Sequence, residues 1–114
     1  MTGTAAIIGG GVIGGGWAAR FLLNGWDVAL YDPDPEAERK MAEILANARH
    51  ALPMLYDISM PDEGRLRHAR TIAGAVAAAD FIQESVPERL DLKHHVLAEI
   101  EAAAKPDAVI GSST

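Results

Sequence analysis

The chain has 114 residues, contains no cysteine and carries a formal net charge of −6 at pH 7. This length allows one domain with a hydrophobic core, and the lack of cysteine excludes disulfides, thiolate metal sites and a cysteine nucleophile. The negative charge, without any cluster of lysine or arginine, argues against a nucleic-acid partner.

The first 19 residues carry no charge, which at first sight suggests a membrane span or a signal peptide. Seven of these residues are glycine, however, and no basic segment precedes the apolar run, so neither interpretation fits. We therefore expect a soluble, cytoplasmic protein with no membrane partner.

Strands and helices alternate along the chain. The apolar run Ala5–Ile8 predicts a first strand, and the segment from Val12 to about Leu23 predicts a helix. The expected apolar stripe of that helix is Ile13, Trp17, Phe21 and Leu22. A second strand is predicted at Trp26–Tyr31, after the helix-ending pair Asn24-Gly25.

The next segment predicts a long helix between the second and third strands. Acidic residues within 33–36 suit the first turn of a helix, which we expect to run to about Leu52. Its residues at helical spacing are Met41, Ile44, Leu45, Ala48 and Leu52. Two prolines and a glycine within Pro53–Gly64 predict a loop or short helices there.

The rest of the chain predicts three more strands and two helices. The third strand, Leu66–Ile72, contains arginines and His68, so we place it near an edge of the sheet. The elements that follow are a helix at Ala73–Ala79, a strand at Asp80–Glu84, a helix from Pro87 to about Ala104 and a strand at Asp107–Gly111. This alternation predicts one α/β domain with a doubly wound parallel sheet.

A glycine-rich turn joins the first strand to the first helix and fits the pattern G-x-G-x-x-G. The candidate cofactor-binding residues of this turn are Gly9, Gly10, Gly11, Val12, Ile13 and Gly14. The first glycine allows a sharp turn, the second lets the backbone approach a pyrophosphate, and the third lets the helix pack closely. The unpaired N–H groups of the first helical turn suit phosphate. In the alternative interpretation, the glycines only form a tight turn.

Asp32 follows the second strand, 18 residues after Gly14. A carboxylate at this place can accept hydrogen bonds from the ribose hydroxyls of adenosine and repels a 2′-phosphate, so we expect NAD rather than NADP. Alternatively, Asp32 only begins a turn with Pro33. The order of strand, glycines, helix, strand and acid predicts a Rossmann-type fold.

The chain resembles the 3-hydroxyacyl-CoA dehydrogenase family along its whole length. The resemblance rests on the glycine turn, the helical insertion at 36–64 and the strings QESVPERLDLK (83–93) and IGSST (110–114). It implies that Glu88 and Lys93 bind the cofactor near its nicotinamide-side ribose and that Ser85 lines the same pocket. Ser85 and Glu88 also fit a capping box at the start of the last helix, and Lys93 fits a solvated helix lysine.

The resemblance further implies hydride transfer from a secondary alcohol to NAD. In the family, a histidine paired with a glutamate takes the hydroxyl proton, and a serine comes directly after the position matching Thr114. The four histidines here, which we expect to be solvated or partly packed, are His50, His68, His94 and His95. We therefore predict no catalytic and no metal-binding residue within 1–114.

The whole enzyme is expected to be longer and homodimeric, with an additional helical domain, as in the family. The resemblance implies a small-molecule substrate, a carnitine-like 3-hydroxy acid, with L-gulonate or a 3-hydroxyacyl-CoA as alternatives. In a hypothesis of another class, the 114-residue chain by itself is a non-catalytic nucleotide-binding module.

Overall fold

The computed structural model describes residues 3–9, 11–51, 62–86 and 90–112. Its strands are β1 (Thr4–Ile8), β2 (Asp27–Tyr31), β3 (Leu66–His68), β4 (Phe81–Glu84) and β5 (Val109–Ser112). Its helices are α1 (Gly11–Leu23), α2 (Ala37–Ala51), α3 (Ile72–Val76) and α4 (Leu90–Ala103). All strand pairs are parallel, in the order β3-β2-β1-β4-β5. The predicted doubly wound, Rossmann-type sheet is confirmed, with α2 as the helical insertion.

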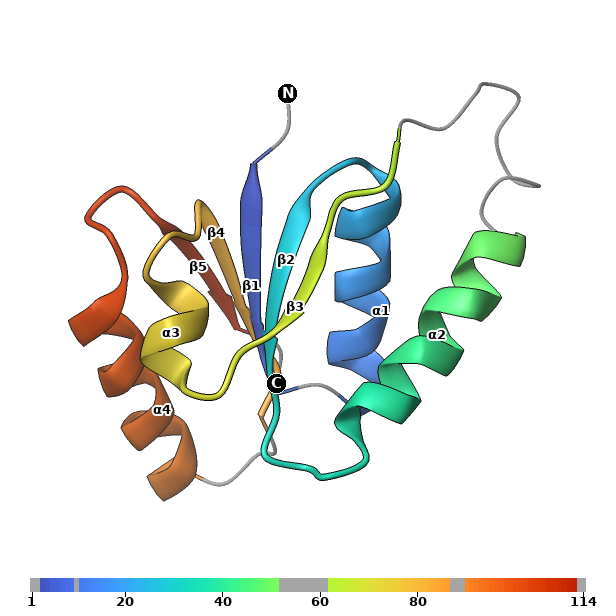
Figure 1. The fold of residues 1–114 in the computed structure, drawn as a ribbon. Helices are drawn as coiled ribbons and strands as arrows, with labels where there is room; N and C mark the ends of the chain where they lie inside the picture. Colours follow the sequence, from blue (N-terminus) through green and yellow to red (C-terminus); the bar gives the residue numbers. More distant parts are fainter. Residues whose placement is uncertain (1–2, 10, 52–61, 87–89, 113–114) are drawn as a thin grey trace.

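The sheet separates two hydrophobic cores. Ala5 and Ile7 of β1 belong to the core under α1 and α2, whereas Ala6 and Ile8 belong to the core under α3 and α4. All four side chains are fully buried, which explains why β1 has a continuous apolar sequence. The helices lie on both faces of the sheet, and the starts of α1 and α2 meet its carboxyl edge (Figure 1).

The buried face of α1 consists of small residues and leucines. The buried residues are Gly14, Gly15, Ala18, Ala19, Leu22 and Leu23. The predicted stripe is therefore wrong at Ile13 and Trp17, which are 64% and 38% exposed. The reason is the close approach of α2, since a Cβ at Gly15 would lie 2.4 Å from Cδ1 of Ile44.

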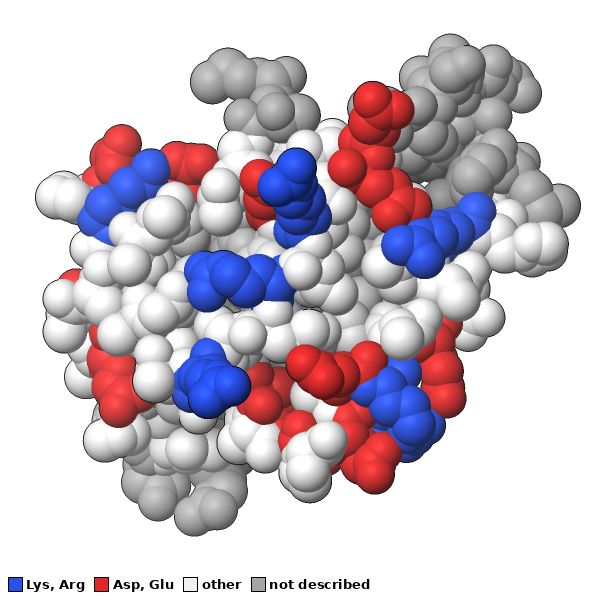
Figure 2. Space-filling view, in the orientation of Figure 1, with Lys and Arg blue, Asp and Glu red and all other residues white. Residues whose placement is uncertain are grey.

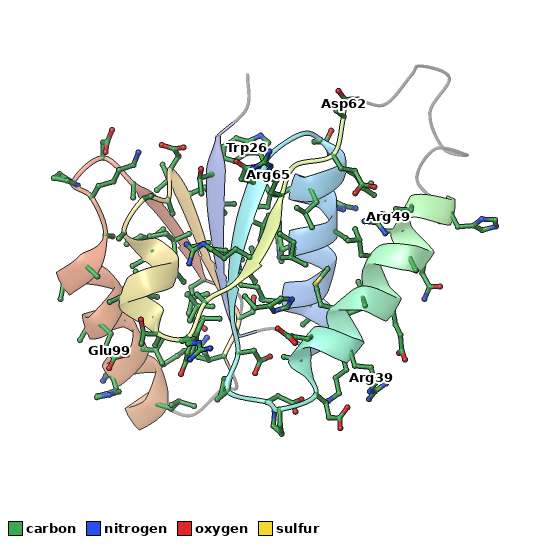
Figure 3. All side chains as sticks on the ribbon, in the orientation of Figure 1. Trp26, Arg39, Arg49, Asp62, Arg65 and Glu99 are labelled. Atoms are coloured by element: carbon green, nitrogen blue, oxygen red, sulfur yellow. The ribbon has the colours of Figure 1, made fainter. Side chains whose placement is uncertain are left out.

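An aromatic cluster closes the core at the amino edge of the sheet. The ring of Phe21 lies 5.1 Å from that of Trp26 and 5.5 Å from that of Phe81, measured between centroids. Trp26 and Arg65 lie together at this edge, while Arg39 lies near the opposite edge (Figure 3). Packing therefore accounts for Phe21 and Phe81.

The boundary between β3 and α3 differs from the prediction. The predicted strand continued to Ile72, but β3 ends at His68 and Ile72 begins α3. Thr71 caps this helix, because its Oγ1 accepts a hydrogen bond of 2.9 Å from the N–H of Gly74. The helix ends at Val76, three residues earlier than predicted. The edge position of β3 is confirmed.

The helix α2 begins at Ala37 and not within 33–36 as predicted, because the side chains of Asp32 and Asp34 hold those residues in turns. The remaining predicted boundaries agree within two residues wherever the structure describes the element end. Met41 and Leu45 of α2 are buried, as their spacing predicts. Most of the predicted loop at 53–64, together with Leu52 and the predicted helix start at 87–89, lies outside the described residues. None of the described helices combines the length and the apolar character that spanning a bilayer requires.

Candidate cofactor site

The glycine turn lies between the ends of β2 and β4. Gly9 has a φ of 85°, a conformation that favours glycine, and its N–H donates a 2.8 Å hydrogen bond to the carbonyl of Tyr31. A Cβ at Gly9 would also lie 3.0 Å from backbone atoms of Ser85. Both the conformation and the space therefore require glycine at this position.

Gly11 and Gly14 serve different purposes at the start of α1. A Cβ at Gly14 would lie 2.2 Å from the carbonyl oxygen of Gly9, so this glycine is needed for packing. Gly11 has a φ of 59°, and a Cβ there would meet nothing within 4 Å. Its outer side is open, as the approach of a pyrophosphate to the backbone requires. Gly10 and the side chain of Val12 lie outside the described residues.

Asp32 lies directly after β2 and is partly buried. Its Oδ1 accepts a 2.9 Å hydrogen bond from the N–H of Asp34, so the carboxylate organises the turn into α2. Asp32 thus begins a turn, as the alternative interpretation predicts. It is compatible with a ribose contact, because a carboxylate has two oxygens with about four acceptor sites.

A pocket between α1, α2 and the end of β2 adjoins Asp32. It is lined by Gly11, Gly15, Leu30, Asp32, Ala37, Lys40, Met41 and Ile44. Most of this lining is apolar, and Asp32 and Lys40 supply the charged groups. A flat base beside a ribose matches this combination of an apolar wall and a carboxylate.

The charged side chains that gather around the start of α2 are paired with one another (Figure 2). Nζ of Lys40 donates a 2.6 Å hydrogen bond to Oδ2 of Asp34. This bond, followed by one from the N–H of Glu36, holds the pKa of Asp34 below its usual value. Arg39 pairs with Glu36 at 2.6 Å. These ion pairs lie beside the turn that follows Asp32.

A second polar cluster lies at the carboxyl ends of β4 and β5. Glu84 is fully buried, and its Oε2 accepts a 2.6 Å hydrogen bond from the N–H of Val86. Its Oε1 accepts a 2.6 Å hydrogen bond from Oγ of Ser112 and lies 3.5 Å from Nζ of Lys93. We call Glu84, Lys93 and Ser112 the carboxylate cluster. The alternative interpretation of Lys93 as a solvated helix lysine is therefore wrong, because its side chain is only 12% exposed.

Ser85 lies beside this cluster and next to the glycine turn. Its Oγ is buried and has no hydrogen-bond partner among the residues that the structure describes. The capping-box interpretation needs Glu88, which lies outside the described residues. Ser85 is thus placed where it could meet a ligand, and the position of Glu88 stays a prediction.

The histidines do not form a site within the described ranges. His50, His94 and His95 are exposed and His68 is partly buried, in agreement with the expectation. Nε2 of His95 lies 3.4 Å from a carboxylate oxygen of Glu99 on the surface of α4. No group of three or more potential metal ligands occurs in the described part of the chain.

These features meet at one edge of the sheet. Ile8, the last residue of β1, pairs with Tyr31 on one side and Glu84 on the other. Asp32 and the carboxylate cluster therefore flank the glycine turn from opposite sides. In doubly wound sheets, ligands bind at this place, outside the carboxyl ends where the strand order reverses. The residues present fit a dinucleotide with its pyrophosphate over Gly11.

Comparison with known proteins agrees with this geometry. A family model described as 3-hydroxyacyl-CoA dehydrogenase, NAD binding domain, matches residues 4–114. The L-carnitine dehydrogenase/betainyl-CoA thioesterase of Ruegeria pomeroyi is 65% identical over 111 residues, which cover 97% of this chain and 23% of that protein. The L-carnitine dehydrogenase of Mesorhizobium japonicum is 64% identical, with 96% and 30% covered. The chain thus spans less than a third of either relative.

Solved structures share the fold. The NAD+-dependent 5-formyl-3-hydroxy-2-methylpyridine 4-carboxylic acid 5-dehydrogenase has a TM-score of 0.85 and 34% identity, covering all of this chain and 37% of that one. The (S)-3-hydroxybutyryl-CoA dehydrogenase of Ralstonia eutropha has a TM-score of 0.77 and 22% identity, covering 97% and 40%.

Proposed function

This chain belongs to the 3-hydroxyacyl-CoA dehydrogenase family, as its NAD-binding domain, and from this premise we propose that the complete protein oxidises L-carnitine. The product is 3-dehydrocarnitine, formed by oxidation of the 3-hydroxyl group. When bound, NAD supplies the acceptor for the hydride. The observation that carries the substrate assignment is the high identity, over nearly the whole chain, to relatives named L-carnitine dehydrogenase.

In this proposal, each end of the site binds one half of the cofactor. The open side of Gly11 and the first N–H groups of α1 face the pyrophosphate, and Asp32 accepts the hydroxyls of the adenosine ribose. In this proposal, Ser85, Glu88 and Lys93 contact the nicotinamide-side ribose. The open backbone at Gly11 and the buried Oγ of Ser85 support this arrangement.

The groups that move the proton belong, in this proposal, to a part of the protein beyond residues 1–114. These residues then form most of the NAD-binding domain, and an additional helical domain completes the site and makes a homodimer. A cytoplasmic location is also part of the proposal. The alternatives are L-gulonate or a 3-hydroxyacyl-CoA as substrate, and a non-catalytic nucleotide-binding role for the isolated chain.

Substrate ranking tests the proposal. The complete protein is assayed for NAD reduction with L-carnitine, L-gulonate and a 3-hydroxyacyl-CoA, and the highest kcat/KM is expected for L-carnitine. A higher kcat/KM for either competitor would refute the carnitine assignment and leave the family membership intact. The 114-residue chain is tested in parallel, where we expect NAD binding without turnover. Turnover by that chain would contradict the placement of the proton-transfer groups.

A further inference from the structure

Glu84 is a buried carboxylate that the cofactor scheme above does not use. We propose that Glu84 is a positioning residue, which holds the ammonium group of Lys93 at the carboxyl ends of β4 and β5 so that this group binds the nicotinamide-side half of NAD. This inference rests on the proposed NAD binding. It adds a residue that contacts no ligand itself and acts through its neighbours in the carboxylate cluster.

The burial of Glu84 is the first argument. A carboxylate that is removed from water is costly unless charges and hydrogen bonds replace the lost hydration. If this position at the end of an interior strand were merely structural, an apolar side chain would serve there as well, often without loss of stability. Glu84 instead places a carboxyl group in the described core. The other residues of β4 have apolar or amide side chains.

The partners of Glu84 show how the group is oriented. The N–H of Val86 fixes Oε2, and the hydroxyl of Ser112 fixes Oε1, each at 2.6 Å. Two short hydrogen bonds, one from the loop after β4 and one from β5, leave the carboxylate little freedom to rotate. Nζ of Lys93 lies 3.5 Å from Oε1, close enough for strong attraction in a buried setting. The carboxylate therefore determines where the lysine ammonium lies.

The position of the cluster indicates which half of the cofactor it serves. Glu84 pairs with Ile8 across the sheet, directly beside the glycine turn. Asp32 lies on the other side of that turn and takes the adenosine half. A dinucleotide that crosses Gly11 must place its other half over the ends of β4 and β5. An ammonium has three N–H donors, so one lysine can make several contacts at once.

The test compares NAD with AMP, because AMP contains only the adenosine half of the cofactor. NAD and AMP are titrated calorimetrically into the complete protein and into its Glu84→Gln variant. Glutamine keeps the size and the hydrogen-bond acceptor but loses the charge that holds Lys93. We expect NAD to bind about tenfold more weakly and AMP to bind unchanged, since a charge-assisted hydrogen bond is worth about that factor. An equal loss for both ligands would overturn the inference, because it would indicate only structural damage.

A double-mutant cycle tests whether Glu84 acts through Lys93. Lys93→Met should also lose about tenfold in NAD affinity, and the double variant should bind NAD no more weakly than Lys93→Met alone. Additive losses would overturn the inference. Should Glu84→Gln not fold, Glu84→Asp takes its place, since it keeps the charge but withdraws it by one methylene. It should lose NAD affinity with AMP binding unchanged, and full NAD affinity would refute the role.

The matched control removes an ion pair at the opposite end of β4. Asp80→Asn breaks the pair between Asp80 and Lys105, far from the glycine turn. It should leave NAD affinity unchanged. The test distinguishes a failure of the proposed function from a failure of the role of Glu84. If the unaltered protein binds no NAD, the proposed function is wrong and this inference with it. If the unaltered protein binds NAD and Glu84→Gln binds it equally well, only the inference is wrong.

Discussion

The carbonyl oxygen of Gly9 lies so close to Gly14 that a Cβ atom at Gly14 would be 2.2 Å from it. The same Cβ would lie 3.3 Å from Cγ2 of Ile7 in β1. The third glycine of the motif thus allows the first turn of α1 to lie against the turn that precedes it. This contact determines where the N-terminus of α1 points.

We therefore expect Gly14→Ala to destabilise the domain by about 1–3 kcal/mol, the usual cost of inserting a methyl group into a filled space. Gly16→Ala is the matched control, because a Cβ there meets nothing within 4 Å. That change should stabilise α1 by about 0.5–1 kcal/mol through the helix preference of alanine. Urea unfolding measures both. Equal free energies of unfolding for the two variants would contradict the packing argument.

Gly11→Ala should reduce both cofactor binding and stability. Alanine at a φ of 59° costs about 1–2 kcal/mol, but the new methyl group touches no protein atom. It points instead into the open space where we propose that the pyrophosphate binds. We expect about tenfold weaker NAD binding, that is, a loss of about 1.4 kcal/mol. The measurement is a calorimetric titration, and unchanged NAD affinity in the folded variant would contradict the placement of the pyrophosphate.

Much of this fold follows from short-range sequence signals. The apolar run at β1 and the glycine spacing predict a strand, a turn and a helix in the observed order. The exposure of Ile13 and Trp17 was missed because glycine and alanine form the buried face of α1. A prediction that relies on large apolar residues does not identify a buried face made of small ones. The prediction extends the third strand to Ile72 because Ile72 is apolar. In the structure, Thr71 caps a helix that begins at Ile72, so the strand ends earlier.

The carboxylate cluster could not be found from spacing alone. Ser112 follows Glu84 by 28 residues, and only the pairing of β4 with β5 brings the two side chains together. The sequence shows an acid at the end of an apolar strand, which is also a common way for a strand to end at the surface. Lys93 was singled out by resemblance, but its ion pair with Glu84 depends on how α4 packs on the sheet.

Asp32→Asn separates the two roles of Asp32. Asparagine retains an oxygen that can accept the 2.9 Å hydrogen bond from the N–H of Asp34, so the turn into α2 should persist. The variant lacks the charge that repels a 2′-phosphate. We expect the ratio of NAD to NADP affinity to fall by at least about tenfold, with little change in the free energy of unfolding. Asp32→Ala should also lower stability, because it removes the acceptor.

Titration of both nucleotides into Asp32→Asn checks this expectation. The control is Lys40→Met, which removes the other charged group of the pocket and should leave the preference for NAD in place. An unchanged affinity ratio in Asp32→Asn would show that Asp32 serves the turn alone.

The ion pair between Asp80 and Lys105 should make stability depend on pH. The ammonium of Lys105, and secondly the N–H of Thr4, hold the pKa of Asp80 below its usual value. Unfolding restores that usual value, about 3.9, so the unfolded chain takes up a proton first as the pH falls. The pair therefore contributes stability above about pH 4, and this contribution is lost as the pH falls through the lower pKa of the folded protein.

Asp80→Asn should thus be less stable than the unaltered protein at pH 7, and the difference should vanish in acid. The effect is small because both side chains are more than a third exposed, and it should shrink further in 1 M salt. Urea unfolding from pH 7 into acid below the lowered pKa of folded Asp80 measures the difference. A difference that persists below the pKa of Asp80, or that does not respond to salt, would mean that the hydrogen bond to Thr4 and local packing, rather than the charge of Lys105, stabilise this end of β4.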